Sequence, residues 1–303
     1  MAASASAGQG AEAGDGSLPA EAATYDELVS AAAEWLSRGS RELPRDVRRL
    51  REMLRQELVM AEPDALPSGR ALASMEALLR RELREKAVVD AAALPRLAED
   101  GRLAVWKGDI TTLRIGGIVN AANENGLGCF QPAHRCIDNI IHCAAGPGLR
   151  AACRQKLRGA KLPTGQALAT LGFCLPAEFV IHTPGPVGEQ PEKLAQCYRS
   201  VLECCKANHI RSVAFCCIST GLFGYPADRA AQVAISTVRR WLDAQELSCR
   251  KQQLASAQGA PEEGGVPPPP PTPPPLDLVV FNVFLESDLD IYRQLLGPDA
   301  GCQ

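Results

Sequence analysis

From about residue 100 the sequence alternates between short apolar runs and helical stretches, and this alternation constrains the fold more than any other feature. The apolar runs are RLAVWKG, GGIVNAAN, EFVIHTPGP, SVAFCCISTG and LDLVVFNVF. The helical stretches between them include residues 191–207 and 227–245. Strands that alternate with helices are typical of layered α/β proteins, because each helix carries the chain back to start the next parallel strand. We therefore predict an α/β fold with a largely parallel central sheet.

The first 95 residues have a different, helical pattern. Residues 1–22 are rich in Ala, Gly and Ser, and we expect them to be disordered. Thr24 and Glu27 then form a capping-box pattern, which predicts a helix that ends near Gly39. In the next two segments apolar side chains recur on one helical face. They are Val47, Leu50, Leu54 and Leu58, and then Leu72, Met75, Leu79 and Leu83. We predict a helical N-terminal extension over residues 24–95.

The overall charge and hydropathy exclude several classes of protein. The chain has 303 residues and a net charge of −3, which gives no general attraction to nucleic acid or to a membrane surface. No apolar run approaches the roughly 20 residues of a membrane-spanning helix. The N-terminus lacks the apolar core of a signal peptide, and it carries acidic residues but no arginine, unlike a transit peptide. We expect a cytoplasmic protein, with the nucleus as the alternative.

The twelve cysteines do not resemble the disulfide framework of a secreted domain. None precedes Cys129, and the adjacent pairs at 204–205 and 216–217 lie inside apolar runs. Because buried thiols pack as small hydrophobic side chains, we expect most of these cysteines in the core. A reducing compartment then favours cysteine–metal chemistry over disulfides.

The segment SAQGAPEEGGVPPPPPTPPP, residues 256–275, interrupts the α/β pattern before the last apolar run. Proline and glycine disfavour both helix and sheet, so we predict a flexible or polyproline insert. A ligand for a proline-recognition domain is the alternative.

Polar or glycine-rich residues follow four of the apolar runs. They are Gly108, Asp109 and Ile110, then Asn120 and Asn123, then His182 and Thr183, and finally the segment STGLFG at 219–224. Ligands of open α/β sheets bind beyond the carboxyl ends of the strands. We therefore predict that these four segments share one rim and form a binding site.

The segment STGLFG suits an anionic ligand. Its glycines allow backbone N–H groups to approach phosphate oxygens, and the helix that follows adds its positive N-terminus. Many such turns only connect two elements, so this signal is weak alone. The segment matches neither a P-loop nor a dinucleotide fingerprint, and without a lysine in these loops nucleoside triphosphate hydrolysis is disfavoured. Asparagine, aspartate, threonine and backbone amides suit a neutral-to-anionic nucleotide.

The segment LGCFQPAHRCIDN, residues 127–139, concentrates metal-binding side chains. Cys129, His134 and Cys136 supply two thiolates and an imidazole, which favour zinc over hard cations. Three protein ligands leave a fourth tetrahedral position for water or substrate, as in catalytic zinc sites. Two alternatives stay open: the cluster is incidental in a cysteine-rich chain, or a cysteine and the histidine form a nucleophilic pair.

Asp138 and His142 are four residues apart, so they share one face of the helix predicted from Cys136. A functional interpretation makes Asp138 a carboxylate that orients water or a ribose hydroxyl, with His142 beside it. The alternative is a carboxylate favoured by the helix dipole and a packed histidine.

Five ordered motifs resemble those of the macrodomains, which bind ADP-ribose and in several branches hydrolyse it from proteins. The motifs are GDITTL, IVNAAN, CIDNIIHCAAGPGLR, VIHTPGP and ISTGLFGYP. The insert GCFQPAHRC resembles the Cys/His/Cys motif of the zinc-containing branch, which also carries a helical N-terminal extension. The resemblance covers roughly residues 24–297 apart from the proline-rich insert. It implies a three-layer α/β/α macrodomain at 96–298 with a mixed, largely parallel sheet.

The resemblance also implies where ADP-ribose binds. Asp109 would contact adenine, Ile110 would lie beside the ring, and Asn123 would face the distal ribose. The diphosphate would lie along a loop made of Ser219, Thr220, Gly221, Leu222, Phe223 and Gly224. Glu124 replaces the small polar residue usual after the Asn-Ala-Ala-Asn motif, and Pro184 replaces a common valine.

The same resemblance implies the metal ligands and the catalytic residues. Cys129, His134 and Cys136 would hold one Zn²⁺ per chain. Asp138 matches an aspartate implicated in catalysis in the related MacroD-type hydrolases, and His142 matches a neighbouring family histidine. With Asn123 they form the candidate catalytic set.

The expected function is a zinc-dependent hydrolase that removes mono-ADP-ribose from modified proteins, with acidic side chains as the expected attachment sites. A module that binds ADP-ribose without turnover, an O-acetyl-ADP-ribose deacetylase and a structural zinc domain are the alternatives. The expected partners are ADP-ribose and a mono-ADP-ribosylated protein, without nucleic acid or membrane, and we expect a monomer.

Overall fold

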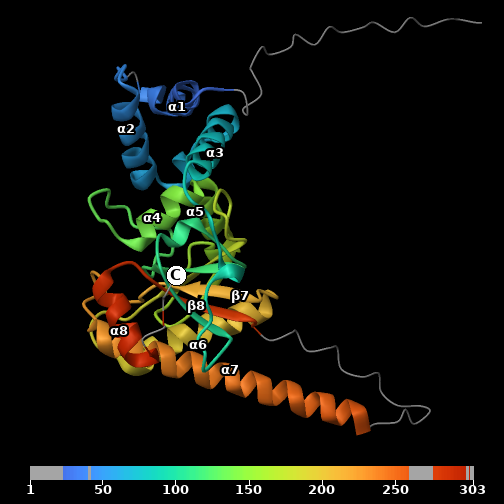
Figure 1. Ribbon diagram of the computed structural model, residues 1–303. Helices are drawn as coiled ribbons and strands as arrows, with labels where there is room; N and C mark the ends of the chain where they lie inside the picture. Colours follow the sequence, from blue (N-terminus) through green and yellow to red (C-terminus); the bar gives the residue numbers. More distant parts are fainter. Residues whose placement is uncertain (1–22, 40–41, 259–275, 298–299, 301–303) are drawn as a thin grey trace, which may run out of the picture.

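The computed structural model describes residues 23–39, 42–258, 276–297 and 300. The described chain forms a small helical module stacked on an α/β domain (Figure 1). The expected disordered segment 1–22 and residues 259–275 of the proline-rich insert lie outside the described residues.

Three helices and short 3₁₀ turns form the N-terminal module. They are α1 (Tyr25–Ala33), η1 (Glu34–Gly39), α2 (Val47–Met60), η2 (Pro63–Ala65) and α3 (Gly69–Arg84). Thr24 and Glu27 form the predicted capping box at α1, and Asp46 caps α2 by accepting from the Arg49 N–H. These side chains satisfy N–H groups that a helix start otherwise leaves unpaired. The three predicted helices are therefore present, and the first two have the predicted starts.

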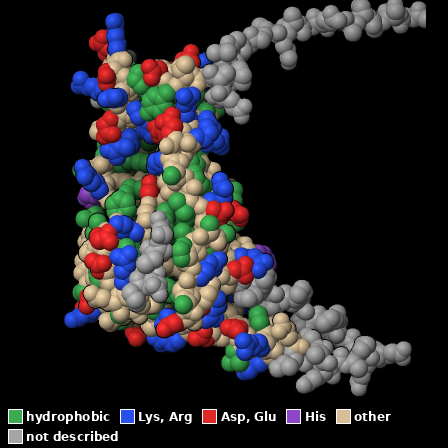
Figure 2. All heavy atoms as spheres, viewed as in Figure 1, with side chains coloured by type: hydrophobic (Ala, Val, Ile, Leu, Met, Phe, Trp, Pro, Cys, Tyr) green, Lys and Arg blue, Asp and Glu red, His purple; other side chains and the backbone are tan. Residues whose placement is uncertain are grey.

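The module has its own apolar core, which the α/β domain completes. Leu54, Met75 and Leu78 are fully buried at its centre, where α1, α2 and α3 meet. Cys174, from the α/β domain, is buried in the same cluster. Outside this core, basic and acidic side chains alternate over the module's surface (Figure 2). Arg51, on α2, pairs with Glu82 of α3 at 2.7 Å, so the arginine-rich face of α2 is partly neutralised.

The α/β domain is built on a six-stranded sheet in the order β2-β8-β7-β4-β6-β5. The strands are β2 (Leu103–Lys107), β4 (Gly117–Ala122), β5 (Leu168–Leu171), β6 (Phe179–Pro184), β7 (Ser212–Phe215) and β8 (Leu278–Val283). All neighbouring strands pair in parallel except β5, which runs antiparallel to β6. A separate two-stranded ribbon pairs β1 (Val89–Asp90) with β3 (Leu113–Arg114). In the chain, η3 (Ala91–Ala93) directly follows β1 and η4 (Ile110–Thr112) directly precedes β3. The predicted mixed, largely parallel sheet is confirmed.

Helices cover both faces of the sheet and give three layers (Figure 1). On the side of the N-terminal module lie α4 (Ile137–Ala145) and α5 (Pro147–Leu157). On the other side lie α6 (Pro191–Ala207), α7 (Ala227–Gln258) and α8 (Glu286–Leu296). The sheet is apolar on both faces for this reason: all six residues of β8 are buried. Within the described residues, no helix combines the length and the apolar character that crossing a bilayer requires.

Two local predictions need correction. The helix predicted over 227–245 extends to Gln258, so residues 256–258 of the predicted insert are helical. Residues 246–258 contain neither proline nor glycine and are rich in helix-forming side chains, whereas the first breaker is Gly259. The edge strand β5 was not predicted, because the four-residue segment LATL is too short for a clear alternation.

Candidate functional site

The carboxyl ends of five parallel strands meet at one edge of the sheet. Lys107, Ala122, Pro184, Phe215 and Val283 are the last residues of β2, β4, β6, β7 and β8. The parallel pairing places the loops that follow them at the same edge. The predicted convergence of strand ends on one rim is therefore confirmed.

Asp109 lies at one end of this rim, just after β2. Its Oδ1 accepts hydrogen bonds from Thr111 N at 3.0 Å and from Thr111 Oγ1 at 2.6 Å. Its Oδ2 lies 3.3 Å from Lys86 Nζ, in a half-exposed ion pair. Such a pair contributes little, about 0–1 kcal/mol, so a ligand displaces it readily. Ile110 is 2% exposed and packs in the core of the α/β domain, and its contact with an adenine ring stays a prediction.

Phe284 is a candidate binding residue that the sequence reasoning missed. It follows β8 directly, and its side chain is 71% exposed. Gly108 N donates to Val283 O at 3.0 Å, so Phe284 and Asp109 follow adjacent strands at the same edge. An exposed aromatic ring at this position offers a flat surface to a planar ligand. The available signal was a phenylalanine just beyond the carboxyl end of a buried strand.

The loop Ser219–Gly224 occupies the middle of the rim, after β7. Ser219 and Gly224 have left-handed backbone angles, with φ of 68° and 67°. Tyr225 N donates to Ser219 O at 3.0 Å and Gly224 N donates to Gly221 O at 3.0 Å, which closes the loop into a tight turn. Ser219 Oγ is buried without a hydrogen-bond partner. Leu222 is 73% exposed at the tip.

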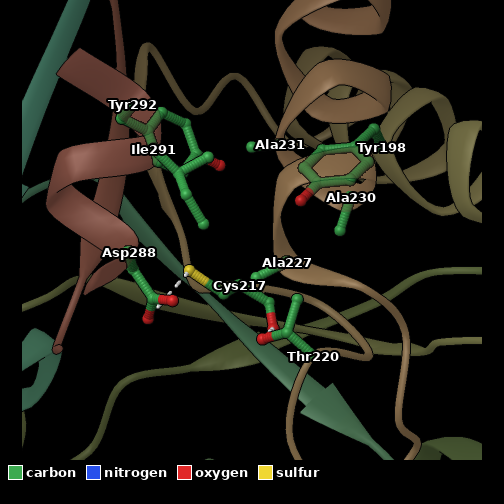
Figure 3. Close-up of a pocket in the computed structure, with 9 residues that line it drawn as sticks. All are labelled: Tyr198, Cys217, Thr220, Ala227, Ala230, Ala231, Asp288, Ile291 and Tyr292. Atoms are coloured by element: carbon green, nitrogen blue, oxygen red, sulfur yellow. Dashed lines mark hydrogen bonds between the residues drawn. The ribbon is translucent and has the colours of Figure 1, made fainter. Parts of the chain in front are cut away.

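A small cavity lies beneath this loop (Figure 3). Its volume of about 10 Å³ suffices for a single water molecule and not for a substrate. Thr220 and Cys217 line it from the loop side, and Cys217 Sγ lies 4.0 Å from Asp288 Oδ2. The residues that line the cavity pack beneath the loop, and the cavity itself is too small to bind a nucleotide.

Asn123 anchors the loop that follows β4. Its Oδ1 accepts from Asn125 N at 2.9 Å and from Gly126 N at 3.2 Å. Its Nδ2 donates to Gly128 O at 3.0 Å. The side-chain amide thus shapes the loop that leads to Cys129. Contact between Asn123 and a ribose stays a prediction.

Two of the three predicted metal ligands lie close together at the end of this loop. Cys129 Sγ is 3.4 Å from His134 Nδ1, but within the described residues the ligand atoms of Cys129, His134 and Cys136 do not all lie within 4.8 Å of one another. Both cysteines are partly exposed, and neither belongs to a disulfide. Cys136 precedes α4 and makes no side-chain capping bond, and its sulfur would have to move toward Cys129 and His134 for all three to hold one metal ion. The donor set of two sulfurs and one imidazole fits Zn²⁺.

Asn139 holds the metal-ligand loop in place. Its Nδ2 donates to Gln131 O at 2.8 Å and to His134 O at 2.9 Å. This residue is buried and lies in the first turn of α4. The loop is therefore tied to a rigid helix and not only to its two ends.

Asp138 is buried in a hydrogen-bonded network behind the loop. Its Oδ1 accepts from Asn120 Nδ2 at 2.8 Å, whereas its Oδ2 is buried without a partner. Burial raises the pKa of Asp138 to about 6, against the lowering effect of the Asn120 hydrogen bond. The same Asn120 Nδ2 lies 3.1 Å from His182 Nδ1, which therefore accepts. His182 Nε2 then carries the proton and faces Thr170 Oγ1 at 3.0 Å.

His142 is neutral and packed against this network. Its Nε2 lies 3.5 Å from Asp138 Oδ1, but the geometry is not that of a hydrogen bond. Burial lowers the pKa of His142 well below its usual range, so the contact is not an ion pair. The ring is 6% exposed, and it lies beneath Gly128, where a Cβ would be 3.3 Å from the ring.

The group of potential metal ligands that does converge within the described residues was not predicted. Within the described residues, ligand atoms of His142, Cys153 and His182 lie within 4.8 Å of one another. Burial lowers the pKa of His182 to about 4 and raises the pKa of Cys153 to about 12, so both are neutral. Because both ring nitrogens of His182 face hydrogen-bond partners, we interpret the group as a neutral network that fixes Asn120 and Asp138.

Arg150 connects the site to the N-terminal module. It is 3% exposed, and its guanidinium donates to Leu58 O at 2.8 Å and to Val59 O at 3.1 Å at the end of α2. The same group also donates to Ala61 O. On its other side it lies 4.5 Å from the centre of the Phe130 ring, inside the metal-ligand loop. Sequence patterns gave no sign of this residue.

Comparison with known proteins identifies the family. The family model of the Macro domain matches residues 119–234. A protein-ADP-ribose hydrolase from Staphylococcus aureus (strain Mu50) is 39% identical over 246 residues, which cover 78% of this chain and 81% of that protein. The chain therefore belongs to the macrodomain family, as its motifs indicated.

A curated relative and a solved structure show how much of each protein the similarity covers. A probable bifunctional ADP-ribose hydrolase/ADP-ribosyltransferase from Fusarium oxysporum f. sp. cubense is 39% identical over 81% of this chain, and the match spans 41% of its own length. The crystal structure of a Trypanosoma brucei macrodomain in complex with ADP-ribose superposes with a TM-score of 0.55 at 28% identity. It covers 88% of this chain and 95% of that one.

Proposed function

We propose that this protein is a hydrolase that removes mono-ADP-ribose from modified proteins. The observation that carries the proposal is the buried carboxylate of Asp138, fixed by Asn120 through one oxygen and unpartnered at the other. Family membership and the names of the relatives from Staphylococcus aureus and Fusarium oxysporum support the substrate class. A protein that only binds ADP-ribose has no need for an unsatisfied buried carboxylate beside the ligand.

In the proposed complex, ADP-ribose lies along the rim. Adenine binds between Asp109 and the exposed ring of Phe284. The diphosphate accepts hydrogen bonds from the loop Ser219–Gly224, where Ser219 Oγ has no protein partner. The distal ribose then reaches the loop that begins at Asn123.

Asp138 performs the proton chemistry in this proposal. Its Oδ1 accepts a hydrogen bond from Asn120, which fixes the direction of its Oδ2. Oδ2 then accepts a proton from a water molecule or from a ribose hydroxyl. The oxygen of the attacking water forms a bond to the anomeric carbon of the distal ribose while the bond from this carbon to the acceptor carboxyl oxygen breaks. Asp138 takes one proton from the water and then releases it to solvent, so the products are free ADP-ribose and the free carboxylate of the acceptor side chain. The neutral network around His182 keeps Asn120, and through it Asp138, in one orientation.

The metal-ligand loop supports a zinc-dependent form of this hydrolase. Cys129, His134 and Cys136 would hold one Zn²⁺ at the ribose end of the rim. When bound, zinc supplies Lewis-acid polarisation of an oxygen or of a water molecule. Asn139 fixes the loop, and Phe130 packs it against Arg150, so the ligands are held from two sides.

Zinc binding is tested by metal content. The wild-type protein is expected to hold about one zinc per chain, and Cys136→Ser well under half of that, because one of three ligands is lost. Mass spectrometry of the metal and circular dichroism are measured on the same samples. Cys249→Ser, which changes a partly exposed cysteine on α7, is the matched control and keeps full zinc. Equal zinc in both variants would disprove the proposed ligand set, and unfolding after chelation would favour a structural metal.

The reaction itself is tested with proteins mono-ADP-ribosylated through glutamate or aspartate, through serine and through arginine. Release of ADP-ribose is expected to be about tenfold or more faster from the acidic linkage. Tight ADP-ribose binding in calorimetry without release from any linkage would support a binding module. Faster turnover of O-acetyl-ADP-ribose than of every protein substrate would support a deacetylase.

A further inference from the structure

A second, open cavity adjoins the ribose end of the rim. It has a volume of about 590 Å³, and Phe223 of the Ser219–Gly224 loop contributes to its wall. Glu124 and Asn125 line it next to Asn123, and the turn 184–187 lines it after β6. The cavity therefore lies next to the proposed position of the distal ribose.

The charge of this cavity is mainly positive. Lys161 and Lys193 line it from the segment before β5 and from the first turn of α6. Both side chains are exposed, and neither forms an ion pair within 4.0 Å with a described residue. The first turn of α6 lacks a side-chain cap, so its free N–H groups add positive potential.

The single acidic residue in the cavity wall is held to one side. Glu124 Oε1 accepts from Thr164 N at 3.2 Å and from Thr164 Oγ1 at 2.8 Å. Leu162 N also donates to the Glu124 backbone oxygen at 2.8 Å. These bonds tie the Glu124 carboxylate to the segment that carries Lys161. Besides the Thr164 hydrogen bonds, Lys161 and Lys193 also help to lower the pKa of Glu124, so the three charged side chains of the wall sum to one positive charge.

We propose that this cavity holds the polypeptide next to the ADP-ribosylated residue and favours acidic flanking residues. The proposal rests on the hydrolase function, because the acceptor protein is attached to ADP-ribose through the distal ribose and its chain must therefore extend from that end of the site. Its volume lies within the 300–1,000 Å³ of typical binding cavities, which suits a few side chains. Lysines across an open cleft select partners by charge more than they add affinity.

Two synthetic peptides that carry the same ADP-ribosyl-glutamate test the proposal. One has aspartate and glutamate on both sides of the modified residue, and the other has asparagine and glutamine. The wild-type protein is expected to show a kcat/KM about fivefold to tenfold higher on the acidic peptide. This is the size expected from two exposed ion pairs between the cavity lysines and the peptide. Raising the salt from about 0.05 M to about 0.5 M is expected to remove most of this preference.

Charge reversal at the cavity provides the second arm. Lys161→Glu combined with Lys193→Glu is expected to abolish or invert the preference, while calorimetric affinity for free ADP-ribose stays unchanged. Arg240→Glu combined with Lys251→Glu, at two exposed positions on α7, makes the same change in net charge and is the control that keeps the preference. Both peptides report the same bond cleavage, so the ratio is insensitive to a general loss of fold.

The outcomes separate this inference from the proposed function. Release from both peptides at equal rates overturns the acidic preference and leaves the hydrolase intact. No release from either peptide overturns both. A third outcome is that the double lysine variant loses more kcat/KM on a mono-ADP-ribosylated oligonucleotide than on the acidic peptide. That result overturns the assignment of the cavity to a polypeptide and favours a nucleic acid.

Discussion

Replacing Asp138 with asparagine is expected to lower kcat for ADP-ribose release by about two to four orders of magnitude, the usual contribution of a general acid or base. Asparagine keeps the shape, and its oxygen still accepts the hydrogen bond from Asn120. An amide nitrogen then replaces the unpartnered Oδ2, and it donates where a proton acceptor is needed. The measurement is single-turnover release of ADP-ribose, with calorimetric affinity for ADP-ribose retained within a few-fold.

Two further variants separate loss of catalysis from loss of binding: one changes another carboxylate, and the other changes the proposed adenine contact. Asp288→Asn makes the same chemical change behind the Ser219–Gly224 loop, where Asp288 contacts Cys217, and is expected to keep near wild-type kcat. Phe284→Ala is expected to weaken ADP-ribose binding about tenfold, since stacking on an aromatic ring contributes about 1–3 kcal/mol. Undiminished turnover in Asp138→Asn would exclude Asp138 as the proton acceptor.

The sheet was predictable because its apolar runs are local signals. Five of the six strands fall within the mainly apolar runs that were named from the sequence, and β8 is buried over its full length. Their parallel pairing also predicted that Asp109, Asn123 and Ser219 share one edge. β5 escaped because an edge strand of four residues gains its stability from pairing with β6 and not from its own pattern.

The individual side-chain contacts of the site were predictable only where its residues are neighbours in the chain. Cys129, His134 and Cys136 show metal-ligand spacing within one short segment, and the structure brings Cys129 to 3.4 Å from His134. The network from Asn120 to His182 joins residues 62 positions apart through a single side-chain contact. No local periodicity encodes such a bond, because it depends on the register of β4 against β6. The buried environment of Asp138 could not be read from sequence for the same reason.

Substituting Arg150 with alanine is expected to lower the free energy of unfolding by about 3 kcal/mol or more. Its guanidinium is buried and satisfies carbonyl groups at the end of α2, including those of Leu58 and Val59. A helix end leaves such carbonyls without intrahelical partners, and each one left buried and unpaired costs about 1–3 kcal/mol. Urea unfolding measures the loss, and hydrogen exchange is expected to show a less protected contact between α2 and the α/β domain.

Arg154→Ala is the matched control one turn further along α5. Arg154 pairs with Asp64 at 3.0 Å, but the two side chains are 46% and 81% exposed. An exposed pair contributes about 0–1 kcal/mol, so this variant is expected to remain close to wild type. Arg150→Lys is expected to fall between the two, because an ammonium group cannot bridge several carbonyls and also lie flat on Phe130.

The Arg150 variant also tests whether the N-terminal module acts on the site. Because the same guanidinium lies over the Phe130 ring, its loss frees the loop that carries Cys129 and His134. Zinc content and KM for a modified protein are then expected to change together, whereas Arg154→Ala alters neither. A variant that is destabilised but keeps wild-type zinc content and KM would show that the module stabilises the fold without positioning the metal-ligand loop.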